Sequence, residues 1–101
     1  MKDNNIEELK RDNTIAPMIE ENRIELYRIK ILNRGEHLFY FDKKKNKALI
    51  VEIQIRNGSI FDKSIKKWDD NESIKNTEKK IILDRIVNYF QVFQKKKAFI
   101  R

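Results

Sequence analysis

The segment "ALIVEIQIR" at residues 48–56 constrains the fold more than any other feature, because its side chains alternate strictly in character. One face carries Leu49, Val51, Ile53 and Ile55, and the other carries Ile50, Glu52 and Gln54. A period of two residues is typical of a β-strand with one buried face. One strand cannot bury that face alone, so the rest of the chain must supply neighbouring strands and a covering layer.

The flanking segments predict a meander of about four strands. "RIELYRIKIL", from Arg23, alternates in the same way, and its apolar parity switches near Tyr27–Arg28, which indicates a bulge or a bend. The "NRG" turn at 33–35 leads into the aromatic strand "EHLFYFD", and the loop "KKKNK" at 43–47 leads into the strand at 48–56. "NG" at 57–58 predicts a hairpin turn into a short edge strand, "SIFDKSI", which Lys63 protects.

One convincing helix follows. Its apolar stripe repeats at helical spacing through Ile82, Ile86, Phe90 and Phe93. We expect Asn76 or Thr77 to cap the helix, which should run to about Gln94, and "AFI" at 98–100 to form a short final strand. The predicted fold class is α+β: an antiparallel β-meander with one C-terminal helix packed on its apolar face.

Charge divides the chain into two regions. Residues 1–22 carry three basic and six acidic groups, whereas residues 23–101 carry twenty basic and ten acidic groups. We predict a flexible or partly helical acidic arm over 1–22, with a short helix across Ile6–Arg11 that is broken before Pro17. Residues 23–101 should form a single domain, since 101 residues are enough for one hydrophobic core.

The only tryptophan, Trp68, lies in the charged segment "SIKKWDDNE" between the last meander strand and the helix. A large ring at that corner would cover the open end of the core, with Ile65 on the same side. We therefore predict a structural role for Trp68, Ile65, Ile82, Ile86 and Phe90. The alternative is an exposed anchor for a partner, because tryptophan is favoured at the centres of interfaces.

This part of the chain resembles the C-terminal half of a family of small bacterial immunity proteins of polymorphic or contact-dependent toxin systems, immunity protein family 74. The matching residues are Ser64, Ile65, Trp68, Asp69, Glu78, Lys79, Ile82, Ile86 and Phe90. Upstream, "YFDKKKNKALIVEI" is similar to the family's second and third strands, so the resemblance covers roughly residues 24–100. It implies a β-meander with one helix, and a protein that neutralises a cognate toxin.

Several kinds of chemistry are excluded by residue counts. The chain has no cysteine and one histidine, His37, so a Cys–His dyad and a cysteine- or histidine-rich zinc site are impossible. Its two glycines cannot build a glycine-rich phosphate loop. Asp42 with Glu52 only faintly matches a metal-dependent nuclease, because Gln54 replaces the lysine. We predict no enzyme activity, no cofactor and no metal.

The N-terminal segment lacks the apolar stretch of a secretory signal, and no apolar run approaches the ~18–20 residues that span a bilayer. We therefore expect a cytoplasmic protein. The oxygen-rich turn "DDNE" at 69–72 could hold a hard cation, although a solvated turn before the helix is the simpler interpretation.

Two functions remain open. The first is an immunity protein that binds and neutralises a toxin by occlusion, without catalysis. The second is a small basic nucleic-acid-binding module, with Phe39 or Tyr40 exposing a ring for base stacking. Exposed loops on a rigid scaffold commonly bind partners. The predicted partner-binding residues are therefore Asp69, Asp70, Glu72, Lys43, Lys44 and Lys45.

Overall fold

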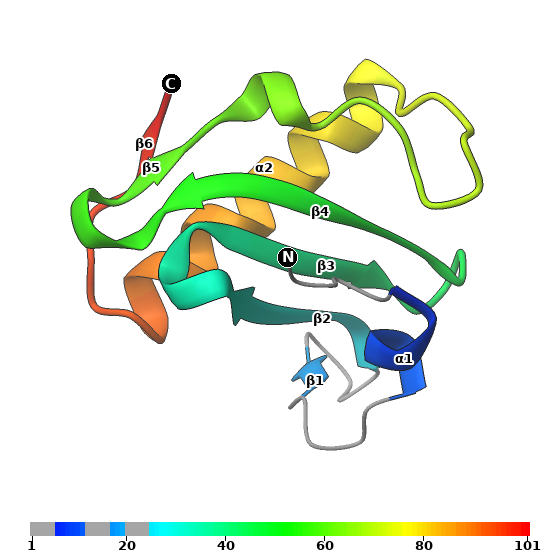
Figure 1. Cartoon of the computed structure of the whole chain (residues 1–101), viewed down its shortest axis with the longest axis horizontal. Helices are drawn as coiled ribbons and strands as arrows, with labels where there is room; N and C mark the ends of the chain where they lie inside the picture. The colour runs from blue at the N-terminus through cyan, green and yellow to red at the C-terminus, as the bar shows by residue number, and fades with distance from the viewer. Residues whose placement is uncertain (1–5, 12–16, 20–24) are drawn as a thin grey trace.

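The computed structural model describes residues 6–11, 17–19 and 25–101. Six strands form one sheet in chain order: β1 (Pro17–Ile19), β2 (Glu25–Leu32), β3 (His37–Asp42), β4 (Lys47–Gln54), β5 (Ser59–Ile60) and β6 (Phe99–Ile100). Neighbours are antiparallel except β5 and β6, which are parallel. The helix α2 (Asn76–Val92) crosses one face, and the short helix α1 (Ile6–Arg11) lies near the β3–β4 hairpin (Figure 1). The predicted α+β fold is confirmed.

The alternation predicted for β4 is also confirmed. Leu49, Val51 and Ile53 are buried in the main core, whereas Glu52 and Gln54 are exposed. Ile50 packs on the opposite face in a second apolar cluster. The side chains of β4 therefore follow the two-residue period that identified the strand.

The predicted irregularity in β2 is present one residue earlier than expected. Glu25 and Tyr27 pair with the consecutive residues Ile19 and Met18 of β1, so residue 26 is an extra residue in β2. This is a β-bulge. The predicted start of that strand at 23–24 and the predicted break of the arm at 12–16 lie outside the described residues.

The connection from β4 to β5 differs from the predicted two-residue turn. A 3₁₀ turn, η3 (Ile55–Asn57), precedes Gly58, and Gln54 pairs with Ser59. Gly58 has a φ of 74°, and a Cβ there would lie 2.1 Å from the carbonyl oxygen of Lys97. The segment before β6 crosses this turn closely, so position 58 has no room for a side chain.

β5 is also not the edge strand that the sequence predicts. It is only two residues long, and β6 pairs along its outer side. Lys63 lies beyond the strand, in the 3₁₀ turn η4 (Asp62–Ser64). The edge position belongs to β6 because the chain returns after α2 to extend the sheet.

Helix α2 begins and ends slightly differently from the prediction. Its N-cap is Lys75 rather than Asn76 or Thr77, and the Glu78 carboxylate accepts a hydrogen bond from the Lys75 backbone N–H at 2.9 Å. Ile82, Ile86 and Phe90 are buried as predicted. Phe93, which was expected in the stripe, is 56% exposed because the helix ends at Val92.

Trp68 fills the corner between the sheet and α2. The ring is buried, and its centroid lies 6.4 Å from that of Tyr40. Ile65 is buried beside it in the same cluster, and Ile74 packs against that cluster. The tryptophan is therefore a core residue in this fold, in a segment whose other side chains are mostly charged or polar.

The segment 61–69 also covers the edge of β4 that the short β5 leaves open. The Phe61 N–H donates to the Glu52 carbonyl at 2.9 Å, and the Glu52 N–H donates to the Ser64 hydroxyl at 2.9 Å. Further along, the Asp69 N–H donates to the Ala48 carbonyl at 2.8 Å, and the Ala48 N–H donates to the Asp69 carboxylate at 3.1 Å. Irregular chain thus satisfies backbone groups that a longer β5 would have paired.

Tyr40 connects the sheet to α2. Its hydroxyl accepts a hydrogen bond from Arg85 of α2 at 2.7 Å, and the Arg85 guanidinium lies 4.5 Å from the centre of the Tyr27 ring. Burial raises the pKa of Tyr40 to about 12, although the Arg85 contact opposes the rise. The folded state therefore keeps this phenol protonated where an unfolded chain would release the proton.

We predict that replacing Trp68 with alanine destabilises the protein by about 3–5 kcal/mol, because it removes a buried aromatic ring. Urea unfolding followed by circular dichroism measures this change. Phe99→Ala, which truncates an aromatic ring that is 43% exposed, is the matched control and should cost far less. Equal losses for the two variants would contradict the core position of Trp68.

A pH prediction follows from Tyr40. Because its folded pKa lies above the unfolded value of about 10, its contribution to stability is complete below pH 10 and is lost as the pH rises to about 12. Unfolding free energy measured across this range should fall, and Tyr40→Phe should remove part of the fall. Tyr89→Phe is the control that should leave it in place.

Candidate functional site

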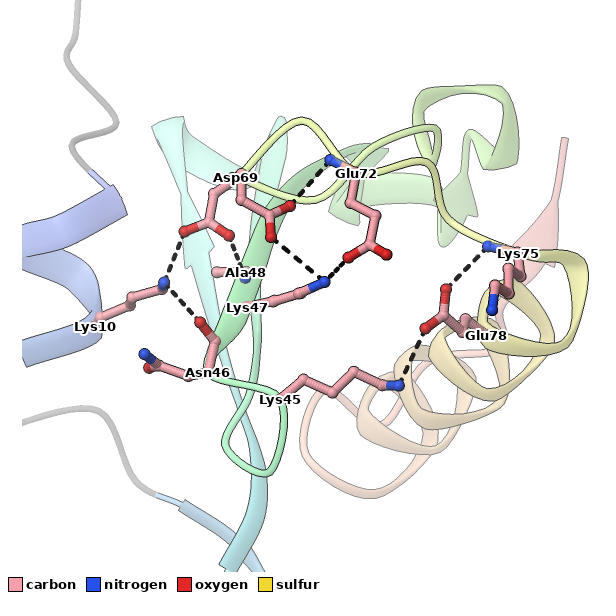
Figure 2. Close-up of polar contacts among 10 residues, drawn as sticks. Lys10, Lys45, Asn46, Lys47, Ala48, Asp69, Glu72, Lys75 and Glu78 are labelled. Atoms are coloured by element: carbon pink, nitrogen blue, oxygen red, sulfur yellow. Dashed lines mark hydrogen bonds and ion pairs between the residues drawn. The ribbon is translucent and has the colours of Figure 1, made fainter.

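The turn at 69–72 and the hairpin at 43–47 lie side by side, as the prediction of a shared surface requires (Figure 2). Lys47 bridges them through ion pairs with Asp70, at 3.3 Å, and with Glu72. We call this region, with Lys10 and Glu78, the charged corner. Three of its lysines, Lys10, Lys45 and Lys47, each face at least one carboxylate.

Asp69 is the most enclosed of the predicted contact residues. Its carboxylate pairs with Lys10 of α1 at 2.6 Å, and both side chains are only 12% exposed. Lys10 also donates to the Asn46 carbonyl at 2.9 Å and lies 5.6 Å from the centre of the Phe41 ring. Together with the bond to Ala48, these contacts make Asp69 the point that holds α1, β4 and the turn together.

Lys45 reaches in another direction, to the start of α2. Its ammonium lies 3.0 Å from the Glu78 carboxylate, which also accepts the Lys75 backbone N–H. That backbone hydrogen bond, with a further contribution from Lys45, lowers the pKa of Glu78. Lys43 lies 5.5 Å from the centre of the Phe41 ring, and Lys44 is exposed.

The charged corner is therefore largely neutralised from within the chain. Asp69, Asp70, Glu72 and Lys45 all have partners of opposite charge. A binding partner would have to displace those partners or add to them. The role of the six predicted residues in binding stays a prediction, and the described contacts give four of them a structural use.

The opposite end of the sheet holds basic side chains that sequence reasoning did not group. We call this region the basic end, and it comprises Arg34, Arg56, Lys95, Lys96, Lys97 and Arg101. The Lys96 ammonium donates to the Arg56 carbonyl at 3.3 Å, and Arg101 donates to the Ser59 hydroxyl at 3.0 Å. Over the described ranges 6–11, 17–19 and 25–101, none of the six has a carboxylate within 4.0 Å.

A topological signal could have revealed this grouping. In a meander, every second connection lies at the same end of the sheet, so the β2–β3 and β4–β5 turns must be neighbours. Those turns carry Arg34 and Arg56, and both lie at the left in Figure 1, opposite the β3–β4 hairpin. The lysine run at 95–97 joins them because β6 pairs beside β5.

Exposed apolar side chains gather in the last part of the chain. Among the described residues the large exposed ones are Ile81, Val92, Phe93, Phe99 and Ile100. Phe99 and Ile100 form the edge strand β6. The Phe99 N–H donates to the Gly58 carbonyl at 2.7 Å and the Arg101 N–H to the Ile60 carbonyl at 2.8 Å, so the N–H of Ile100 points to the outer edge.

The structure also places His37, Phe39 and Tyr40, which the sequence analysis considered for catalysis or base stacking. His37 lies in β3, where its Nδ1 is 2.9 Å from the Asn33 amide nitrogen. Phe39 and Tyr40, one of which was expected to expose a ring, are both fully buried, so that expectation is wrong. Both faces of the sheet are covered there, one by α2 and the other by the cluster that includes Ile6 and Leu9 of α1.

The described residues contain no group of three or more histidine, cysteine, aspartate or glutamate side chains placed to hold a metal ion. In the same part of the chain, no helix is long and apolar enough to cross a membrane.

No protein-family model, curated protein or solved structure matches this chain. The resemblance to the immunity family therefore stays a prediction from the quoted motifs.

The contacts of Asp69 generate a test with a built-in control. Asp69→Ala removes an enclosed ion pair and the acceptor for the Ala48 N–H, so it should destabilise the protein by about 2–3 kcal/mol. Asp70→Ala, which removes an exposed ion pair and the acceptor for the exposed Glu72 N–H, should cost less than about 1 kcal/mol. Chemical denaturation of both variants checks this, and equal costs would contradict the assigned role of Asp69.

Proposed function

We propose that this protein is an immunity protein that binds a bacterial toxin stoichiometrically and neutralises it by occlusion. The observation that supports the proposal best is the edge strand β6, which presents two exposed apolar side chains and an outward backbone N–H. An edge of this kind is a template for a strand from another protein.

The surroundings of β6 have the composition of a protein interface. Its anchors are Phe99 and Ile100, which are 43% and 51% exposed. Lys97 and Arg101 flank them along the chain, and the Arg101 guanidinium lies 5.4 Å from the centre of the Phe99 ring. Aromatic and arginine side chains are enriched at interface centres. The basic flanks fit a toxin whose contact surface is acidic.

The alternative function, nucleic-acid binding, is favoured by one observation, the cluster of six basic residues at the basic end. Phosphate-driven binding weakens steeply as salt rises. On duplex DNA, the logarithm of the binding constant falls against the logarithm of the salt concentration with a slope of about −0.9 per phosphate contact. The burial of Phe39 and Tyr40 removes the stacking rings that a sheet-based binder would use. For this reason we place the protein-binding function first.

The test first requires a candidate partner, which we would seek as a toxin domain encoded next to this gene. Titration of that toxin's activity should end at one inhibitor per toxin, because occlusion consumes the inhibitor. Ile100→Pro removes the outward N–H while leaving the bonds of Phe99 to Gly58 and of Arg101 to Ile60, and should weaken inhibition about tenfold or more. Ile100→Ala keeps the N–H but removes the side chain. Comparing it with Ile100→Pro separates the effect of the lost side chain from the effect of lost strand pairing.

Ile81→Ala is the control, since Ile81 is as exposed as Ile100 but lies on α2. It should inhibit like the unchanged protein. Catalytic disappearance of the toxin at low inhibitor ratios would contradict occlusion. Tight binding of mixed-sequence DNA at physiological salt, without toxin inhibition, would favour the alternative function.

A further inference from the structure

A pocket of about 340 Å³ lies between the two turns of the basic end. Arg34 and Glu36 line one side, and Gln54, Arg56 and Asn57 line the other. The two arginines are 22 positions apart in the sequence, and the meander brings them together. Guanidinium groups can grip a carboxylate through two parallel hydrogen bonds, so two of them around one pocket make it a strong acceptor of acidic groups.

The walls of this pocket are held rigidly. The Ile53 N–H donates to the Glu36 carbonyl at 3.1 Å, and a Cβ on Gly35 would lie 2.2 Å from Ile55. Asn33 and Arg34 have left-handed backbones, with φ of 50° and 59°, which residues other than glycine seldom adopt. These conformations belong to the tight turn between β2 and β3, which places Arg34 at the pocket.

A second pocket of about 320 Å³ adjoins the first, and Glu36 and Gln54 line both. Glu52 and His37 also line the second pocket. Over the described ranges, neither Glu36 nor Glu52 has a basic side chain within 4.0 Å. A hollow lined by two arginines and Glu36 thus lies next to a hollow lined by Glu36 and Glu52, along one end of the sheet.

We propose that these pockets bind a protein segment carrying an acidic side chain next to a basic one. The acidic side chain enters between Arg34 and Arg56, and the basic one lies against Glu36 and Glu52. This inference rests on the proposed protein-binding function and adds a charged recognition site to the strand edge at β6.

The paired charges favour a protein segment over a nucleic acid. A phosphate backbone would gain from Arg34 and Arg56, but its uniform negative charge would be repelled by Glu36 and Glu52. A peptide with both signs satisfies both pockets. The Asn57 and Gln54 amides, joined by a hydrogen bond of 2.9 Å, lie in the wall and present polar groups to a peptide.

The experiment is an NMR titration of ¹⁵N-labelled protein with two probes. One is the capped peptide acetyl-Gly-Glu-Lys-Gly-amide, and the other is a 20-nucleotide oligothymidine. The peptide should shift the amide signals of Gly35, Glu36 and Asn57, with saturation. Arg34→Gln together with Arg56→Gln should raise its dissociation constant about tenfold, since both charged donors are lost.

The control is Lys66→Gln with Lys80→Gln, which removes the same charge from exposed residues outside the pockets. It should bind the peptide unchanged. Equal weakening in both double variants, or no pocket signals shifted at the solubility limit of the peptide, would overturn the proposal. Stronger shifts of these signals by oligothymidine than by the peptide would also overturn it, in favour of nucleic acid.

Toxin inhibition separates this proposal from the proposed function. If Arg34→Gln with Arg56→Gln inhibits the toxin normally while Ile100→Pro does not, the pockets are not used and the immunity role stands. If neither the unchanged protein nor any of its variants inhibits the toxin, the proposed function fails, whatever the peptide titration shows.

Discussion

The backbone edge of β4 that faces β5 is the constraint on which the rest of the structure depends. β4 has eight residues, but β5 pairs with only two of them, so much of its edge must be covered in another way. The chain from Phe61 to Asp69 does this with backbone and side-chain hydrogen bonds to Glu52 and Ala48. Trp68 is buried because the same segment must cover the end of the core. Its charged neighbours are there because the segment also faces solvent and α1.

Much of this fold was predictable because period and turn chemistry act locally. The alternation at Leu49, Val51 and Ile53 and the helical spacing of Ile82, Ile86 and Phe90 led directly to β4 and α2. The errors occurred where distant segments decide the outcome. The β4–β5 turn is wider than its "NG" dipeptide indicates, with η3 before Gly58, and the distant Lys97 carbonyl lies close to that glycine. β5 gives up the edge to a strand that is about forty residues away in the sequence.

The candidate site was harder to predict for the same reason. The sequence grouped charges that are neighbours in the chain, and so drew attention to 43–45 and 69–72. Folding does bring these two groups together, but it pairs Lys47 with Asp70 and Glu72 within the molecule. Arg34 and Arg56 are isolated in the sequence and meet only through the meander. Sequence order therefore showed where the charge is dense, and topology determined where basic charge lacks an acidic partner.

These observations give the molecule two electrostatically different ends: a charged corner neutralised from within, and a basic end whose side chains lack carboxylate partners among the described residues. The paramagnetic relaxation of backbone amides by a cationic and an anionic nitroxide, compared residue by residue, measures the local surface potential directly. We predict the most positive potential around 33–35, 55–58 and 95–97, and a much weaker potential at 43–47 and 69–72. The most positive potential at 43–47, with a weak one at the turns of Arg34 and Arg56, would contradict it.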